Sequence, residues 1–308
     1  MPASEHSLSV VIVNWNSGDQ LRNCLQSLEG RYPAVVVDNG SVDGSCEVVS
    51  EFKNVTLIEA HTNLGFGKAC NLGARYVDSD YLLFLNPDAK LYPDSLDRAL
   101  SWMRQPEHSQ YSICSIQMVD GIGNVARSCA RFPTAWTFFA QIVGVDKFLP
   151  KLALSMVDWS HSSTRTVDHV IGAFYLVRRR LFDELNGFDE TFFLYFEDLD
   201  FSYRAKRAGA LSVYLSDAQA FHAGGGTSNQ IKAQRLFYVL RSRILYAHKH
   251  FSRLGCLTVC LSTFLVEPFS RSALSIARRS GSALKETWQA YLMLWQWLPK
   301  WIFRGVTR

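Results

Sequence analysis

The first residues of this chain that could do chemistry are three polar clusters, each of which directly follows an apolar run. The run Tyr81–Leu85 is followed at once by Asn86, Pro87 and Asp88. A buried strand of that kind delivers a carboxylate to its carboxyl end, where open α/β sheets bind ligands. The same Asn-Pro-Asp tripeptide is also a common turn, so these residues by themselves favour a site and a plain turn equally.

Two earlier apolar runs, at 9–13 and 34–37, end in polar residues in the same way. The carboxyl ends of parallel strands share one edge of a sheet, so we expect these ends to form a crevice of donors, acceptors and carboxylates. Such a crevice suits a nucleotide. The residues predicted to line it are Asn14, Asn16, Asp38, Asn39, Asn86 and Asp88.

The segment 62–68 combines two glycines with Lys68 just before a predicted helix. Glycine lets the backbone approach a ligand closely, and a helix amino end favours phosphate. The spacing is not that of a Walker loop, so a helix-capping loop is equally supported. We include Asn63, Gly65 and Lys68 among the candidate nucleotide-binding residues.

A second acidic cluster, Glu197, Asp198 and Asp200, opens a predicted helix that runs to about residue 208. One or two acidic residues in a first helical turn are ordinary, because the helix dipole favours them. Here three carboxylates fall within four residues, after an aromatic-rich segment that would shape a dry pocket. Glu197 and Asp198 are therefore candidates for a general base.

Two further features have a functional and a structural interpretation. His222 precedes three glycines. A lone histidine is more often structural, but one in this setting is a candidate ligand of a metal diphosphate. The run Arg178–Arg180 could bind phosphate, although most such charge runs are solvated faces.

The elements that must position these residues alternate between strand and helix. Strands are predicted at 9–14, 34–38, 55–59 and 81–85, with helices at 18–28, 43–52 and 68–77. This alternation predicts a parallel sheet with helices on both faces. Beyond Leu100 the alternation fades: strands are predicted at 113–118 and 170–177, and the apolar stretch 138–155 has no clear period.

Composition excludes a disordered chain, because 48% of the 308 residues are hydrophobic and 19% are charged. The net charge is +4, but residues 251–308 carry eight Lys/Arg against Glu267 and Glu286. That tail is therefore +6 and residues 1–250 are −2. The basic character belongs to the tail.

The cysteines indicate a reducing compartment. They number seven and include no CxxC pair, and Cys256 and Cys260 lack the neighbouring His or Cys of a zinc site. We expect reduced, mostly buried thiols in a cytoplasmic protein. Residues 1–7 hold no apolar core of signal-peptide length, so we expect no export.

Taken in order, these motifs make the chain similar to the inverting GT-A glycosyltransferases of family 2, and within them to the bacterial rhamnosyltransferase-like branch. The similar stretches span roughly residues 9–250 and follow the family order. They are VIVNWNSGDQLRNCLQSL (11–28), VVVDNGSVDGS (35–45), NLGFGKACNLGARY (63–76), LLFLNPDAKLYPDSL (82–96), GAFYLVRRRLFDELNGFDETFFLYFEDLDFSYRAKRAG (172–209) and FHAGGGTS (221–228).

The resemblance implies roles for the donor-site residues. Asp38 resembles the residue that reads the nucleotide base, with Asn14 and Asn16 lining the same crevice. Asp88 takes the place of the last Asp of the family's Asp-x-Asp motif, which binds Mg²⁺ or Mn²⁺ bridging the sugar-nucleotide diphosphate. The first Asp of that motif is Asn86 here, which leaves the metal fewer protein anions.

The resemblance also implies roles for the later residues. His222 resembles the distal metal or diphosphate ligand, Asp198 the catalytic base, and Glu197 a residue that assists at the acceptor. Arg131 resembles a recurrent position of the branch; we include it among the donor-site residues without a specific role. We expect a nucleotide-sugar-binding half at 1–100, an acceptor and catalytic half at 101–250, and a basic amphipathic helical tail at 251–308.

The tail holds two uncharged runs of 13 residues each, 254–266 and 287–299, and both are shorter than the ~20 residues that span a bilayer. Basic, tryptophan-rich amphipathic helices lie in the interface of anionic membranes. A helical subdomain packed on the catalytic core, or a dimer contact, is the alternative. We favour a cytoplasmic protein held peripherally at the inner face of the membrane, where it meets an acceptor carried on polyprenyl diphosphate, and we expect no nucleic-acid partner.

The leading functional hypothesis is transfer of a sugar, with L-rhamnose from dTDP-rhamnose as the best guess, to a lipid-linked saccharide in cell-surface polysaccharide synthesis. A UDP-sugar donor, carrying galactose or N-acetylglucosamine, is the first alternative. A sugar nucleotidyltransferase would have a glycine- and arginine-rich loop near the amino end, whereas residues 10–20 hold one Gly and no Arg. A non-catalytic binding protein would have no reason to keep Asp88, Asp198 and His222 together.

Overall fold

The computed structural model describes residues 7–224 and 231–307. The chain groups into two compact units. The first consists of Met1–Ala130, Trp159–Glu190 and Glu197–Thr227, and the second of Arg131–Asp158, Thr191–Phe196 and Ser228–Arg308. The three functional parts expected from the sequence, with boundaries at 100 and 250, divide the chain differently and remain a proposal.

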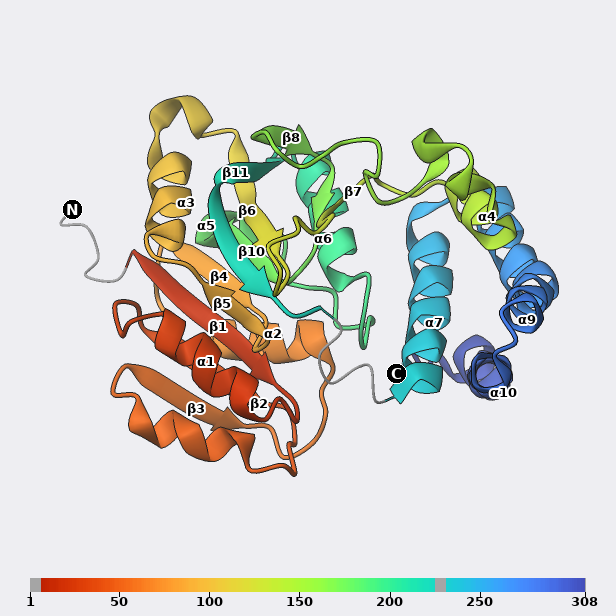
Figure 1. The fold of residues 1–308 in the computed structure, drawn as a ribbon, viewed down its shortest axis with the longest axis horizontal. Helices are drawn as coiled ribbons and strands as arrows, with labels where there is room; N and C mark the ends of the chain where they lie inside the picture. The colour runs from red at the N-terminus through yellow and green to blue at the C-terminus, as the bar shows by residue number, and fades with distance from the viewer. Residues whose placement is uncertain (1–6, 225–230, 308) are drawn as a thin grey trace. The chain divides into compact units, whose positions relative to one another are not determined.

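The first unit is built on a mostly parallel sheet (Figure 1). In the described part of the chain the strand order is β3-β2-β1-β4-β10-β6-β11-β5, with β8 also pairing β11. Strands β10 and β5 run antiparallel to their neighbours. The strands are β1 (Leu8–Asn14), β2 (Ala34–Asp38), β3 (Val55–Glu59), β4 (Tyr81–Leu85), β5 (Ala89–Leu91), β6 (Tyr111–Val119), β8 (Arg165–Val167), β10 (Phe174–Arg178) and β11 (Leu211–His222), and β7 (Cys129–Ala130) pairs β9 (His169–Val170) separately.

Helices cover both faces of this sheet, which is why its central strands are apolar throughout. On one face, alternate residues of the strands pack with α1 (Asp19–Ser27) and α3 (Ser95–Arg104) into one core. On the other face, α2 (Phe66–Ala74) lies so close to β1 that a Cβ on Gly73 would be 2.5 Å from Cγ1 of Val11. Glycine at this position therefore permits the close approach of helix and strand.

An aromatic cluster fills the second face and joins distant segments. The ring centroid of Phe188 lies 4.9 Å from that of Phe84 on β4 and 5.3 Å from that of Phe201 on α6 (Glu197–Arg207). Asn71 of α2 holds the same segment, because its amide donates to the carbonyl of Phe188 at 2.8 Å and its Oδ1 accepts from the Phe188 N–H at 2.9 Å. The chain that leads into α6 is thus fixed from two sides.

The predicted fold class is confirmed: a mostly parallel α/β sheet flanked by helices, with a helical carboxyl-terminal segment. Two elements differ from expectation. The predicted helix at 43–52 is a 3-10 helix at Ser45–Glu51. The predicted strand 170–177 breaks into β9 and β10, because the chain leaves the partner of β9 before it enters the central sheet beside β4.

The arginine run after β10 has a structural role. Arg178 donates to the carbonyls of Tyr111 at 2.8 Å and Met103 at 2.5 Å, and to the hydroxyl of Tyr81 at 2.7 Å. Arg179 of the short helix α5 (Arg179–Glu184) donates to backbone carbonyls at the end of α2. Because β10 is antiparallel, the run lies at the edge of the sheet opposite to the predicted crevice. These donors tie loops together, and the phosphate-binding interpretation is not supported.

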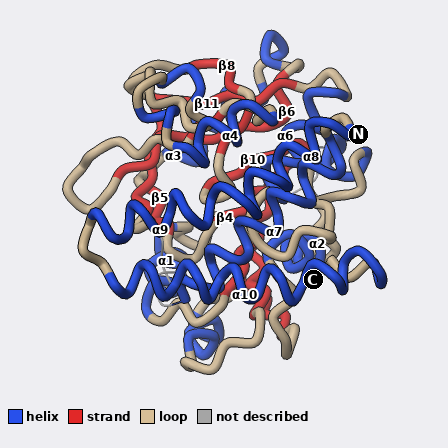
Figure 2. Tube along the Cα trace, turned by 90° about the vertical axis from the view of Figure 1, so that its right-hand side faces the viewer, coloured by secondary structure: helices blue, strands red, loops and turns tan. Residues whose placement is uncertain are grey.

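The second unit is helical in its described residues. Its helices are α4 (Ala135–Val143), α7 (Lys232–His250), α8 (Arg253–Leu261), α9 (Glu267–Ala277) and α10 (Gly281–Arg304), with a π-helical turn at Ser262–Val266 between α8 and α9. Helices α9 and α10 run side by side, and α4 lies against α8 (Figure 2). Among the helices described, none combines the length and the apolar character needed to cross a bilayer.

Candidate active site

The carboxyl ends of β1 and β2 form a hydrogen-bond network around Asn14 and Asp38. The two residues are paired in register, and the Asn14 amide lies 3.2 Å from Oδ1 of Asp38 and 2.8 Å from Oγ of Ser45. Asp38 also accepts from the N–H of Ser41 at 3.1 Å. Burial opposes ionisation of Asp38, but hydrogen bonds from Cys46, Ser41 and Asn14 outweigh it and lower the pKa of this carboxylate. Asp38 thus keeps its charge and a fixed orientation.

Asn14 and Asn16 differ in their access to a ligand. Asn14 is fully buried, so its amide is closed to direct contact with a ligand and reaches the crevice only through its hydrogen bond to Asp38. Asn16 is half-buried and adopts a left-handed conformation, with φ of 49°. Its N–H donates to Oγ of Ser41 at 2.9 Å, and its Oδ1 accepts from the N–H of Val42 at 2.8 Å. The loops that follow β1 and β2 are therefore tied together at the crevice.

Asn39 connects the end of β2 to the loop before α2. Its Oδ1 accepts from the N–H of Leu64 at 2.7 Å, and its Nδ2 donates to Oδ1 of Asn63 at 3.0 Å and to the carbonyl of Gly65 at 3.3 Å. Lys68 lies in the first turn of α2, and its Nζ is 3.7 Å from Oε2 of Glu190. The structure thus brings these predicted residues to the same edge of the sheet as Asp38.

Asp88 and His222 face each other across two neighbouring strands. Ala89 and His222 are paired in register, and the carbonyl of Asp88 accepts from the N–H of Ala223 at 3.2 Å. Nε2 of His222 is 3.3 Å from Oδ1 of Asp88, but it is buried and makes no well-aligned hydrogen bond. The rest of the predicted motif, Gly225–Ser228, lies outside the described residues.

This pair fits a divalent cation. Carboxylate oxygen suits Mg²⁺ and Mn²⁺, and Nε2 of His222 would offer an electron pair beside it when it carries no proton. No group of three or more His, Cys, Asp or Glu side chains suited to a metal occurs in residues 7–224 and 231–307. A cation held by Asp88 and His222 would therefore need oxygens from a bound diphosphate or from water.

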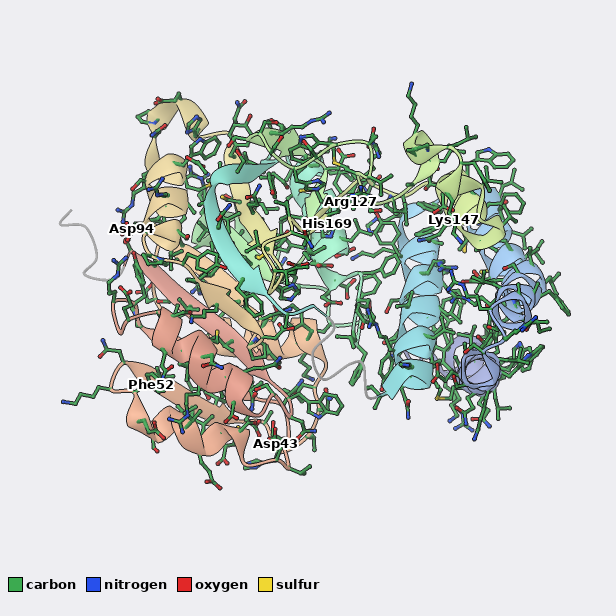
Figure 3. All side chains as sticks on the ribbon, in the orientation of Figure 1. Asp43, Phe52, Asp94, Arg127, Lys147 and His169 are labelled. Carbon is green, nitrogen blue, oxygen red and sulfur yellow. The ribbon has the colours of Figure 1, made fainter. Side chains whose placement is uncertain are left out.

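Asp198, on the first turn of α6, is held by two backbone N–H groups. Its Oδ2 accepts from Gly172 at 2.8 Å and its Oδ1 from Leu199 at 2.8 Å. Nε2 of His169 lies 3.8 Å from the same Oδ2, beside α6 (Figure 3). Burial lowers the pKa of His169 against the influence of Asp198, and its Nδ1 lies 3.0 Å from Oγ of Ser202.

Glu197 occupies a different environment from its neighbour. Its side chain is buried, and its Oε2 makes no hydrogen bond. Burial, reinforced by the negative charge of Asp198, raises the pKa of Glu197 well above its ordinary value. Glu197 is therefore closed to direct contact with an acceptor, and it would assist there only by positioning Asp198.

The chain enters α6 through a strained segment. Tyr195 and Phe196, immediately before Glu197, both have left-handed backbone conformations, with φ of 67° and 73°. Such conformations are costly for bulky residues and collect at functional sites, where the surrounding packing enforces them.

One junction joins the two predicted chemical centres. The N–H of Asn86 donates to the carbonyl of Ala173 at 3.0 Å, while the N–H of Gly172 donates to Asp198. Asn86, two residues before Asp88, and Asp198 are thus both hydrogen-bonded to the segment 172–173 that leads into β10. The antiparallel direction of β10 makes this possible, because its first residues lie at the carboxyl edge of β4.

Arg131 lies in the second unit, and its neighbours there account for its side chain. Its guanidinium donates to both carboxylate oxygens of Asp158 at 2.7 Å, and its N–H donates to the carbonyl of Leu154 at 2.8 Å. A place in the donor site remains a prediction for this residue.

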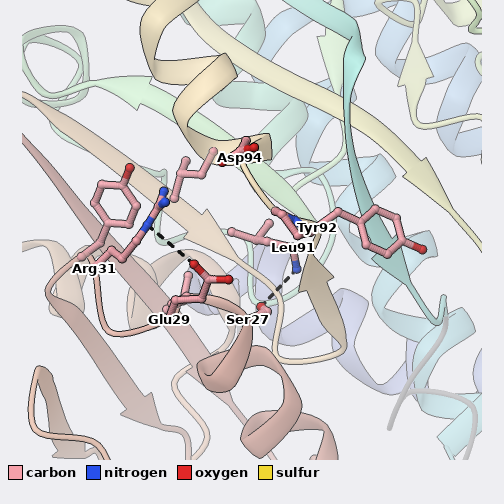
Figure 4. Close-up of a pocket in the computed structure, with 10 residues that line it drawn as sticks. Ser27, Glu29, Arg31, Leu91, Tyr92 and Asp94 are labelled. Carbon is pink, nitrogen blue, oxygen red and sulfur yellow. Dashed lines mark hydrogen bonds and ion pairs between the residues drawn. The ribbon is translucent and has the colours of Figure 1, made fainter.

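A surface pocket of the first unit is lined by none of the predicted site residues (Figure 4). It lies between the end of α1 and the loop that leads from β5 to α3, and its lining includes Ser27, Arg31 and Tyr92. Oγ of Ser27 accepts there from the N–H of Leu91 at 3.1 Å. Nothing in its lining indicates a ligand.

Sequence reasoning missed several residues that hold the site. Ser41 and Cys46 hydrogen-bond Asp38, Ser45 accepts from the Asn14 amide, and His169 approaches Asp198. Asn71 offered one usable signal, because it is a buried amide on the core-facing side of α2. No sequence pattern indicates the contact between His169 and Asp198, because it depends on how β9 packs against α6.

Comparison with known proteins agrees with this geometry. The model of the family described as "Glycosyl transferase family 2" matches residues 9–185. The N-acetylglucosaminyl-diphospho-decaprenol L-rhamnosyltransferase of Mycobacterium tuberculosis is 30% identical over 253 residues, which cover 74% of this chain and 80% of that protein. The rhamnosyltransferase WbbL of Escherichia coli is 27% identical over 251 residues, which cover 77% of this chain and 91% of that protein.

A solved structure supports the fold. The mannosyltransferase PcManGT from Pyrobaculum calidifontis, in complex with GDP-Man and Mn²⁺, superposes with a TM-score of 0.54 at 16% identity. The match covers 99% of this chain and 83% of that one. The sheet thus has the GT-A arrangement, and the chain belongs to glycosyltransferase family 2.

Proposed function

We propose that this glycosyltransferase uses a bound Mg²⁺ or Mn²⁺ and inverts the anomeric centre of a nucleotide-activated sugar as it transfers that sugar to a lipid-linked saccharide. The observation that carries the proposal is that Asn86, two residues before Asp88, and Asp198 are both hydrogen-bonded to the segment 172–173. In our proposal, Asp88 serves the donor diphosphate and Asp198 serves the acceptor hydroxyl.

Asp198 would act as the general base. Both of its oxygens are oriented by backbone N–H groups, so the carboxylate does not need to reorganise during the reaction. It accepts the proton of the acceptor hydroxyl while that oxygen bonds to the anomeric carbon. The bond from this carbon to the diphosphate breaks, and the nucleoside diphosphate leaves from the opposite face.

The donor would occupy the crevice at the carboxyl edge of β1, β2 and β4. Asp38 would accept a hydrogen bond from the nucleotide base, with Asn16 beside it. Asp88 and His222 would hold the cation, which neutralises negative charge on the departing diphosphate. The amino end of α2, with Lys68 in its first turn, favours the same phosphates.

L-rhamnose from dTDP-rhamnose is our proposed donor group, with a polyprenyl-diphosphate saccharide as acceptor in the synthesis of a surface polysaccharide. The names of two relatives support it, because both are rhamnosyltransferases and one of them is named for a decaprenol diphosphate. We further propose that the protein works in the cytoplasm at the inner face of the membrane, held there by its basic tail.

A panel of donors tests this function. The purified chain is incubated with Mn²⁺, an N-acetylglucosaminyl polyprenyl diphosphate, and dTDP-rhamnose, UDP-galactose or UDP-N-acetylglucosamine. We expect dTDP release from dTDP-rhamnose, a product of inverted anomeric configuration, and loss of activity with a chelator. UDP release alone would correct the donor, and pyrophosphate release from a sugar phosphate and a nucleoside triphosphate would refute the proposal in favour of a nucleotidyltransferase.

A further inference from the structure

The second unit concentrates the positive charge of the chain. It holds 16 Lys/Arg against 4 Asp/Glu, a net charge of +12, which leaves −8 for the rest of a chain whose total is +4. The sequence alone assigned the basic character to residues 251–308. The structure adds α7 and the separate segment 131–158 to the same unit.

The polarity of the π-helical turn and α9 is inverted relative to a helix of a soluble protein. Their buried side carries Ser262, Thr263, Glu267 and Ser275, whereas α8 buries Val259. Glu267 is nearly inaccessible and lies between two arginines, at 2.6 Å from Nη1 of Arg243 and 2.8 Å from Nε of Arg271. Soluble helices bury their apolar stripe and expose their polar side.

The exposed side of α8, the π-helical turn and α9 is apolar. Phe269 is 65% exposed and Leu254 is 75% exposed. Successive members of this stripe are mostly three or four residues apart, the spacing of one helix face, and the π-helical turn takes one residue more per turn. The stripe consists of Leu254, Leu257, Leu261, Leu265, Phe269 and Ile276.

Neighbouring helix α10 continues the pattern. It packs against α9 and α7 with Ala290, Tyr291 and Leu294 buried. Its exposed apolar residues recur at helical spacing along the opposite side. They are Trp288, Leu292, Trp295, Ile302 and Phe303.

Segment 131–158 belongs to the same surface. Helix α4 packs against α8 and the π-helical turn (Figure 2), and the carbonyl of Ile142 accepts from Oγ of Ser270 at 2.8 Å. Trp136 is 73% exposed and Phe148 is 84% exposed. Lys147 adjoins Phe148 at the turn after α4 (Figure 3).

We propose that α4, its following turn, and helices α8 to α10 form a single lipid-facing surface that inserts exposed apolar side chains into the interface of an anionic bilayer. The inference rests on the membrane binding proposed above and extends it to segment 131–158. Exposed apolar side chains enter the acyl boundary, and the basic residues around them attract anionic head groups. A surface that bound a second copy of the chain would bring two units of charge +12 together, which electrostatics opposes.

Vesicle sedimentation of the full chain tests this surface. We expect the protein to bind vesicles made of equal parts phosphatidylcholine and phosphatidylglycerol, and to bind phosphatidylcholine alone more weakly. Phe148→Asp and Phe269→Asp should each reduce the partition coefficient roughly tenfold or more, because each replaces a phenyl ring inserted in the bilayer by a charge. Tyr76→Asp, at an exposed position of the first unit, is the control and should leave binding unchanged.

The outcomes separate the surface from the reaction. Wild-type binding by Phe148→Asp would overturn the inclusion of segment 131–158, and Trp136→Asp serves as the second variant there if Phe148→Asp fails to fold. A dimer in analytical ultracentrifugation that Phe269→Asp dissociates, without vesicle binding by the wild type, would replace the bilayer by a second copy. Donor hydrolysis in the absence of vesicles reports on the proposed function alone, so either proposal can fail without the other.

Discussion

Substitution of Glu197 by Gln should stabilise the protein, although this residue lies next to the proposed catalytic base. Burial and the charge of Asp198 raise the pKa of Glu197 well above its ordinary value. The folded state therefore keeps a proton that the unfolded chain releases above about pH 4.3. A raised carboxyl pKa means that stability is lost as the pH rises toward the folded-state pKa.

The magnitude follows from proton linkage. While the unfolded chain is ionised and the folded protein is not, the free energy of unfolding falls by about 1.4 kcal/mol per pH unit. Gln cannot ionise, has nearly the same shape, and leaves one buried polar group unpaired, as the protonated Glu does. The advantage of Glu197→Gln should thus grow by up to about 1.4 kcal/mol for each pH unit from about pH 5 upward.

Equilibrium urea unfolding, followed by circular dichroism at several pH values, measures this difference. Asp200→Asn on the same helix is the matched control, because Asp200 is fully buried with its Oδ2 2.7 Å from Nε of Arg204. Removing that charge leaves a poorly compensated arginine and should cost about 3–5 kcal/mol. If Glu197→Gln is less stable than the wild type at neutral pH and the gap does not change with pH, Glu197 is ionised in the folded protein and our reasoning is refuted.

Three further predictions concern the site. Asp198→Asn should reduce sugar transfer by roughly 10²- to 10⁴-fold while the Kd for nucleoside diphosphate stays unchanged, measured by product release and calorimetry; a fully active variant would contradict the base assignment. Asp88→Ala should weaken donor binding in the presence of Mn²⁺ but not in the presence of a chelator, and equal weakening in both would argue against a metal ligand. Asn71→Ala removes two hydrogen bonds from the buried backbone of Phe188 and should lower the free energy of unfolding by about 2–4 kcal/mol; an unchanged thermal melt would show that this clamp contributes nothing.

The sequence by itself determined the parallel half of the sheet. The predicted strands at 34–38, 55–59 and 81–85 agree with β2, β3 and β4 to the residue. Parallel strands are buried on both faces, so each is a continuous apolar run that a polar residue ends. The same rule placed Asp38 and Asp88 at strand ends without any knowledge of the neighbouring strands.

Only the tertiary structure decided which side chains and backbone groups meet at those strand ends. The antiparallel insertion of β10 beside β4 brings Gly172 to Asp198, and these two residues are 26 positions apart in the chain. Glu197 and Asp198 are adjacent in the sequence, yet one is buried without a partner and the other accepts two hydrogen bonds. Local sequence patterns report which side chains avoid water, whereas the partner of each side chain depends on long-range packing.

The same distinction holds for the second unit. Runs of Leu, Phe and Trp in residues 251–308 indicated apolar helices. Only packing shows that the π-helical turn and α9 bury Ser262, Ser275 and Glu267 while Leu254 and Phe269 are exposed. Segment 131–158 joins that unit across about a hundred residues, so no local pattern could have assigned it. Composition determined that the chain has an apolar, basic end, and the fold decided which of its faces meets solvent, because that choice depends on contacts between distant helices.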